Sequence, residues 1–217
     1  MFLRSLTLLT LLAAQAVTPD PPLHGLPVRT TAKGNIAADP VNIAFEGSRS
    51  AILSAFSRAG WVKADPLSLR DDARLAVDAV THHSYPAAPV SSLYLFGRSE
   101  DFAVEHELGT VAKRDHARLW ESKRSDPVTH LELWIGDAAQ DNGIEVLRRH
   151  HVPIGTTHHI NPNLDAERSL IVTLLRRTGM VRTVLMEPGM GRTTDGKNAG
   201  GDRFYTDGQL AVIVLNG

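Results

Sequence analysis

The chain has 217 residues, of which 42% are hydrophobic and 22% are charged, a balance typical of one globular domain with an apolar core. Its 23 Lys and Arg residues nearly cancel its 24 Asp and Glu residues, so the formal net charge is −1. This charge gives no overall positive field that would favour nucleic acid or an anionic membrane. The sequence contains no Cys, which excludes stabilisation by disulfides and lipid attachment through an N-terminal Cys.

The first sixteen residues have the order of a secretory signal. Arg4 precedes an apolar run that begins at Leu6, and Ala14-Gln15-Ala16 has the small-x-small pattern of a cleavage site. The apolar run is shorter than the roughly 20 residues that span a bilayer, and no later segment is apolar enough to do so. We therefore expect residues 1–16 to be a cleaved signal peptide and the mature protein to be periplasmic or secreted. An uncleaved signal that anchors the chain in the membrane is the alternative.

The next segment, residues 17–38, is rich in Pro, Gly, Ala and small polar residues, and predicts a flexible linker before a domain over residues 39–217. Alternating apolar residues predict a strand over 41–46. A helix should follow Ser48, with Ile52, Ala55, Phe56 and Ala59 on one face and Gly60 after its end. The segment 68–80 has the capping and apolar spacing of a second helix.

Two strands are predicted over residues 116–121 and 130–136, and they are plausible antiparallel neighbours. Period-two alternation places His116, Arg118 and Trp120 on one face of the first strand, and Glu132 and Trp134 on one face of the second. If the Leu and Ile residues between them face the core, these two polar faces together line a cleft. Alternatively, one face of the sheet is covered by helices and the other is solvated.

The last third of the chain completes the predicted fold. A third helix should begin within residues 161–165 and bury Ile171, Leu174 and Leu175. A strand over 181–186 leads into a glycine-rich loop at 188–201, and Asp207-Gly208 predicts the turn of a hairpin over 203–215. The predicted fold class is α+β: a single domain with a mixed, largely antiparallel sheet and about three helices packed on it.

Five stretches of the chain carry distinctive motifs: YPAAPVSSLYLFGRSEDFA (85–103), HARLW (116–120), WIGDAAQDNGI (134–144), HHINPNLDAER (158–168) and YTDG (205–208). Together, and in this order, they resemble the LssY C-terminal domain family of bacterial envelope proteins. The resemblance covers about Asp39 to Leu215 and implies no established activity. In many relatives the domain follows membrane-embedded segments that are similar to DedA-type proteins or lipid phosphatases, whereas this chain has a signal peptide.

The stretch from His158 to Arg168 concentrates ionisable residues at the start of the third predicted helix. His116, Asp165 and one of the adjacent His158 and His159 form a candidate ligand set for zinc or another divalent metal, because zinc accepts imidazole and carboxylate ligands. Only one of the two adjacent histidines can face a site, since neighbours on an extended chain point to opposite sides. Glu167 is the candidate general base, and Arg168 is the second catalytic candidate. The alternative is structural, since the helix dipole stabilises carboxylates in a first turn. Asn161 and Asn163 stand where relatives tend to have Asp, which removes two anionic ligands.

Two hypotheses of function follow. The first is a non-catalytic envelope module that binds a partner protein, a glycan or a lipid headgroup, with exposed Trp120 or Trp134 as anchors. The second is a metal-dependent hydrolase of a phosphoester or a related envelope substrate, in which the metal activates water and Glu167 takes its proton.

Overall fold

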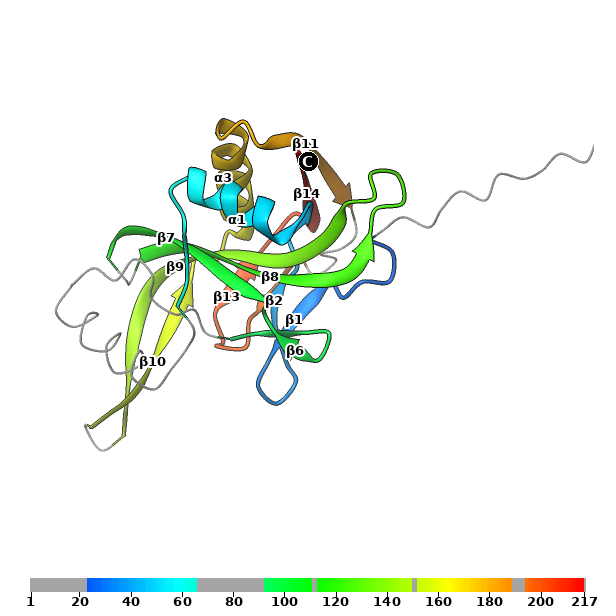
Figure 1. Cartoon of the computed structure of the whole chain (residues 1–217). Coiled ribbons are helices and arrows are strands. Elements are labelled where there is room, and N and C mark those ends of the chain that lie inside the picture. The colour runs from blue at the N-terminus through cyan, green and yellow to red at the C-terminus, as the bar shows by residue number, and fades with distance from the viewer. Residues whose placement is uncertain (1–22, 66–91, 111–112, 150–151, 189–193, 217) are drawn as a thin grey trace, which may run out of the picture.

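A computed structural model describes residues 23–65, 92–110, 113–149, 152–188 and 194–216 (Figure 1). Strands dominate these residues, and the described part contains two helices, of 10 and 14 residues. The expected α+β fold with about three helices is therefore corrected to a mainly β fold. The helix predicted over 68–80 lies outside the described residues.

The largest sheet has eight strands in the order β11-β14-β3-β9-β8-β7-β4, with β10 paired to β9. Every neighbouring pair is antiparallel except β14 and β3, which are parallel. The strands are β3 (Ile43–Glu46), β4 (Val62–Lys63), β7 (Phe102–Thr110), β8 (Lys113–Ser125), β9 (Glu132–Arg149), β10 (Val152–Ile160), β11 (Val181–Pro188) and β14 (Gln209–Leu215).

The antiparallel pairing of β8 and β9 confirms the predicted neighbours, but β9 is far longer than the expected strand over 130–136. Residues 137–143 form a polar segment closed by Gly143, which the sequence alone suggests is a turn or a loop; in the structure they continue the strand. Asp137 and Asp141 each lie opposite an arginine of β8, and both carboxylates are buried. Because these buried positions carry charged residues, the alternation of apolar and polar residues does not predict a strand here.

Two smaller sheets lie outside the main one. The first has the order β2-β1-β5-β6, formed by β1 (Arg29–Ala32), β2 (Ile36–Pro40), β5 (Tyr94–Leu95) and β6 (Arg98–Ser99). The second pairs β12 (Asp195–Lys197) with β13 (Arg203–Tyr205). The presence of β1 and most of β2 within residues 17–38 corrects the expected linker. Leu26 and Ala38 pack with Trp120 and Ile135 in a common apolar cluster, so this segment belongs to the core.

One face of the main sheet packs against Leu26 and Ala38, and both helices cover the other face (Figure 1). Helix α1 (Arg49–Arg58) begins after Ser48, whose hydroxyl accepts the Ala51 amide, and Gly60 follows its end with a φ of 87°. Helix α3 (Leu164–Arg177) begins after Asn163, whose side chain accepts the Ala166 amide. The predicted start and end of α1 are confirmed, and its predicted face is buried except for Ala59, which is partly buried. Helix α3 begins within the predicted residues and buries Ile171 and Leu175, whereas Leu174 is only partly buried. Neither helix is long and apolar enough to cross a membrane.

The predicted hairpin over 203–215 is wrong. Strand β13 pairs with β12, and β14 runs between β11 and β3 in the main sheet. The Asp207-Gly208 turn, where Gly208 has a φ of 76°, therefore moves the chain from a small sheet into the large one. An Asp-Gly pair requires a turn, but it does not determine which strands pair on either side of it.

The two tryptophans of the central strands face opposite sides of the sheet. Trp120 packs in the cluster beneath β1 and β2, whereas Trp134 packs in the helix-side core against Phe102. The predicted cleft lined jointly by Trp120 and Trp134 is therefore absent. Both side chains are also buried, at 0% and 3% exposure, so neither is an anchor for a partner on the surface of this chain.

Candidate functional site

Alternate side chains of β8 carry charge to the sheet face opposite the helices. Arg118 lies opposite Asp137, and Arg114 lies opposite Asp141, so each pair shares that face. Arg118 Nη1 is 2.8 Å from Asp137 Oδ2, and Arg114 Nε is 2.8 Å from Asp141 Oδ2. All four residues are at most 5% exposed. Charges this deeply buried require partners, and each pair supplies them.

His116 lies between the two arginines on the same strand and is also buried. Its Nδ1 atom is 3.4 Å from Asp141 Oδ1. The other oxygen of Asp141 binds Arg114, which reaches Glu105 Oε2 with its Nη1 atom at 2.6 Å. Because Arg114 holds Asp141, the second carboxylate oxygen of Asp141 stays beside the imidazole of His116.

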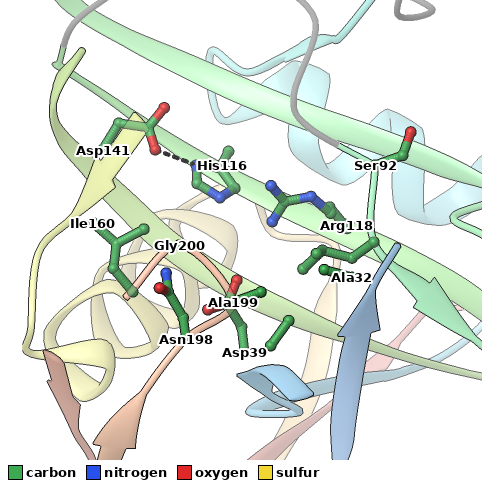
Figure 2. A pocket seen from close by; sticks show the side chains of 12 residues that line it. Ala32, Asp39, Ser92, His116, Arg118, Asp141, Ile160, Asn198, Ala199 and Gly200 are labelled. Atoms are coloured by element: carbon green, nitrogen blue, oxygen red, sulfur yellow. Dashed lines mark ion pairs between the residues drawn. The ribbon is translucent and has the colours of Figure 1, made fainter. Parts of the chain in front are cut away.

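A pocket of about 260 Å³ opens in front of His116 and Arg118 (Figure 2). Its walls come from the main sheet, from β2 and the chain before β5, and from the turn between β12 and β13. The lining residues are Ala32, Ala38, Asp39, Ser92, Leu93, His116, Arg118, Asp141, Ile160, Asn198, Ala199 and Gly200. Apolar walls that carry a few polar groups are typical of small-ligand sites.

Asp39 of β2 supplies a carboxyl to this pocket from the side facing Arg118 (Figure 2). It is 6% exposed, and its Oδ1 atom has no hydrogen-bond partner among the described residues. Burial raises the pKa of Asp39, while the charge of Arg118 and a hydrogen bond from the Asn198 side chain oppose the rise. A buried acceptor without a donor is rare in folded proteins, and it marks a position where a ligand group can bind.

Asp137 also departs from ordinary titration. The pKa of Asp137 is raised to about 7, because burial and the charge of Asp39 raise it by more than the charge of Arg118 lowers it. Two carboxyls therefore share the positive charge of Arg118, and they retain protons more strongly than exposed carboxyls do. Strongly perturbed carboxyls beside a pocket are common at functional sites.

The turn between β12 and β13 forms one rim of the pocket. Asn198 Oδ1 accepts the backbone amide of Asp202 at 2.9 Å, which leaves its amide nitrogen as a donor toward Asp39. Asp202 Oδ1 lies 2.8 Å from His159 Nδ1, and its Oδ2 accepts the Ile160 amide. His159 therefore fixes the rim of the pocket against the end of β10.

The first turn of α3 binds the segment before β14. Asp165 accepts the Thr206 hydroxyl at 2.6 Å and the Asp207 amide at 2.7 Å. Arg168 binds Asp207 with both Nη atoms and also donates to the Gln209 carbonyl oxygen. Hydrogen bonds from Arg168 lower the pKa of Asp207. These contacts join the HHINPNLDAER and YTDG motifs by hydrogen bonds that stabilise the fold.

Glu167 points from α3 into the helix-side core and is 3% exposed. The pKa of Glu167 is raised to about 9, mainly by burial and also by the charge of Asp115, a hydrogen bond with that carboxylate and the charge of Asp141. Asp115 is fully buried and also accepts the Gln140 amide at 2.8 Å. At neutral pH Glu167 is thus protonated and donates to Asp115.

The sequence-predicted site residues are distributed over separate parts of the molecule. His116 lies in the pocket, His159 at its rim, Asp165 and Arg168 at the α3 junction, and Glu167 in the helix-side core. His158 is part of β10, and its side chain is outside the described set. Within the described residues, no group of three or more His, Cys, Asp or Glu side chains is placed to hold a metal.

The predicted common face of His116 and Arg118 is confirmed, and both residues line the pocket. Sequence reasoning missed Asp39, Asp141 and Asn198 as pocket residues. Asp39 fell at the expected domain start, Asp141 in a supposed turn, and Asn198 in a glycine-rich loop. The sequence offered one signal, an unusual density of polar residues in otherwise apolar strands. This density does not indicate that the three residues share a site.

The fold and the site define a mainly β domain that has a buried, charged pocket on one face of its largest sheet. The family model for the LssY C-terminus matches residues 23–210. The chain belongs to this family, which confirms the resemblance seen in its motifs. Searches of curated proteins and of solved structures found no match.

Proposed function

We propose that this chain is an exported binding module whose pocket takes one polar group of an envelope component, a glycan or a lipid headgroup. The observation that carries the proposal is the buried Oδ1 atom of Asp39, which lacks a donor among the described residues although it lies beside Arg118 and Asn198. A ligand hydroxyl or amine would satisfy this acceptor without rearranging the strands.

The rigidity of the pocket supports binding. His116, Arg118 and Asp141 lie on the two longest strands of the main sheet, and each side chain is held by an ion pair or a close charged neighbour. Polar groups on rigid strands lose little entropy when a ligand arrives, so more of the interaction energy appears as affinity. This pocket replaces the tryptophan anchors that the sequence suggested.

The signal-like segment over residues 1–16 supports the exported location, because an envelope ligand would then be accessible to the mature chain. A periplasmic or secreted module of this kind would bind its ligand without a membrane span of its own.

Isothermal titration of the mature protein tests the proposal, with N-acetylglucosamine as the glycan probe and glycerol 3-phosphate as the headgroup probe. At least one probe should bind, and Asp39→Asn should weaken that binding about tenfold or more, the equivalent of one lost hydrogen bond. Asp195→Asn is the matched control, because Asp195 is an exposed carboxyl on the neighbouring strand β12. Equal affinities in wild type and Asp39→Asn would contradict the proposal.

The metal-dependent hydrolase suggested by the sequence has one supporting observation, the buried contact between His116 and Asp141, which has the form of a base and its orienting carboxylate. The candidate ligands around it are dispersed, so its support is weaker. Zinc content of the purified protein and turnover of p-nitrophenyl phosphate test this alternative. Stoichiometric zinc that is lost in His116→Ala, together with turnover, would favour it over simple binding.

A further inference from the structure

We infer that the ligand of this pocket is an uncharged, hydroxyl-rich unit of the size of one sugar ring, selected against phosphate and against amines. The inference rests on the proposed function, because it names the chemical class that the same pocket would bind. Three properties of the described residues carry it: the balance of charge, the mixture of donors and acceptors, and the volume.

The charge of the pocket disfavours an anion. The guanidinium of Arg118 is bound to Asp137 and faces Asp39, while Arg114 is bound to both Asp141 and Glu105. Carboxylates thus outnumber guanidinium groups in this buried cluster. A phosphate, which carries about −1.5 to −2 charges near pH 7, would have to displace Asp137 from Arg118 and approach Asp39 and Asp141. Removal of a buried carboxylate from its partner is costly, so phosphate binding should be weak.

The hydrogen-bonding groups favour hydroxyls over an amine. Asp39 and Asp141 are acceptors, whereas Arg118 and the amide nitrogen of Asn198 are donors, and these groups surround one space (Figure 2). A hydroxyl both donates and accepts, so neighbouring hydroxyls of one ring can satisfy Asp39 and meet the donors. An ammonium group only donates, so it would leave the Arg118 and Asn198 donors without an acceptor from the ligand.

The volume limits the ligand to one small unit. The pocket measures about 260 Å³, which is below the roughly 300–1,000 Å³ typical of sites for drug-sized ligands. The apolar part of its wall is formed by Ala32, Ala38, Leu93, Ile160 and Ala199. Such walls suit the C–H faces of a compact ring. The ring could belong to a soluble glycan or to the headgroup of a glycolipid, which share this chemistry.

Three ligands with the same ring test the inference: glucose, glucosamine and glucose 6-phosphate, each titrated into the mature protein at one pH and ionic strength and followed by NMR. We expect glucose to bind about tenfold or more tightly than glucose 6-phosphate and at least as tightly as glucosamine. In Asp39→Asn, glucose should bind more weakly and the preference over glucose 6-phosphate should shrink. Asp195→Asn, on an exposed strand residue, should preserve both values.

Tighter binding of glucose 6-phosphate or of glucosamine would overturn the uncharged class while leaving the pocket as a binding site. No binding by any of the three, nor by N-acetylglucosamine or glycerol 3-phosphate, would overturn the proposed function itself. If glucose binds, a glucose disaccharide and vesicles that carry glucosyl diacylglycerol distinguish the two sources. Preference for the disaccharide indicates a glycan, and preference for the vesicles indicates a lipid headgroup.

Discussion

Arg168 of α3 binds the carboxylate of Asp207 with both of its Nη atoms, each at 2.8 Å, and so joins the helix to the start of β14. The arginine side chain is 5% exposed, and the same guanidinium also contacts Asp165 at 3.1 Å. Arg168 is the second catalytic candidate that the sequence suggested. Its contacts instead resemble those of a structural bidentate pair, which is well suited to hold two segments in one geometry.

Arg168→Ala should therefore lower the free energy of unfolding by about 2 kcal/mol, because Asp165, Asp207 and the Gln209 carbonyl all lose a donor. Urea denaturation measures this change, and Arg176→Ala in the exposed last turn of α3 is the control. The folded fraction of Arg168→Ala should still bind the pocket ligand with unchanged affinity. Normal stability combined with lost binding would mean that Arg168 acts at the site.

Glu167→Gln should change how stability depends on pH. The pKa of Glu167 is raised to about 9 in the folded protein, so the folded state holds this proton more tightly than the unfolded chain. Its contribution to stability is therefore complete below the unfolded pKa of about 4.3 and is lost as pH rises toward 9. Glutamine keeps a donor toward Asp115 without titrating, so the variant should not lose this contribution. Its free energy of unfolding, relative to that of wild type, should rise by on the order of 3 kcal/mol between pH 6 and pH 9.

Thermal unfolding across this pH range measures the difference, and Glu132→Gln, at an exposed position, is the control. If the stability of wild type rises from pH 6 to pH 9 and Glu167→Gln follows the same curve, Glu167 is not protonated in the folded protein.

Gly136→Ala tests the close approach of β9 to β8. A Cβ atom at Gly136 would lie 2.1 Å from the Arg118 carbonyl oxygen and 2.6 Å from Leu119 Cδ2, so the two strands would have to separate. We expect a loss of about 3 kcal/mol, at the upper end of overpacking costs, with displacement of Arg118 and weaker ligand binding. Gly200→Ala is the control for stability, since its nearest neighbour would be an ordinary contact at 3.4 Å. An unchanged midpoint of unfolding for Gly136→Ala would contradict the observed strand spacing.

The sequence predicted local elements better than it predicted their partners. Helix α1 could be located from Ser48, its apolar spacing and Gly60, because capping and periodicity are local properties. The extent of β9 could not, because Asp137 and Asp141 are buried by ion pairs with residues about twenty or more positions earlier in the chain. The pairing of β13 with β12 likewise depends on the whole sheet, and the Asp207-Gly208 turn carries no information about it.

In the candidate site, too, only the residues that are close together in the chain could be predicted to lie together. His116 and Arg118 could be placed on one face by period two alone, since both belong to β8. Asp39 and Asn198 reach the pocket from β2 and from the β12–β13 turn, which are 159 positions apart in the chain. No spacing rule connects residues this distant, so only the folded chain brings them together.

Export makes a separate prediction. If residues 1–16 are cleaved, intact mass spectrometry of the protein recovered from the periplasm should give a chain that begins at Val17. Ala16→Leu should block cleavage by removing the small residue at the site, whereas Ala13→Leu lengthens the apolar run and should not. Recovery of the full chain from Met1 in the membrane fraction would indicate an uncleaved anchor.

Mapping of ¹⁵N amide shifts during a glucose titration shows whether the pocket in front of His116 and Arg118 is the ligand-binding site. We predict that the largest shifts fall on Ala38, Asp39, Leu93, Asn198 and Gly200. At the same glucose concentrations they should be smaller in Asp39→Asn and unchanged in Asp195→Asn. Shifts centred instead on Asp165 and Thr206 at the α3 junction, or undiminished in Asp39→Asn, would contradict this prediction.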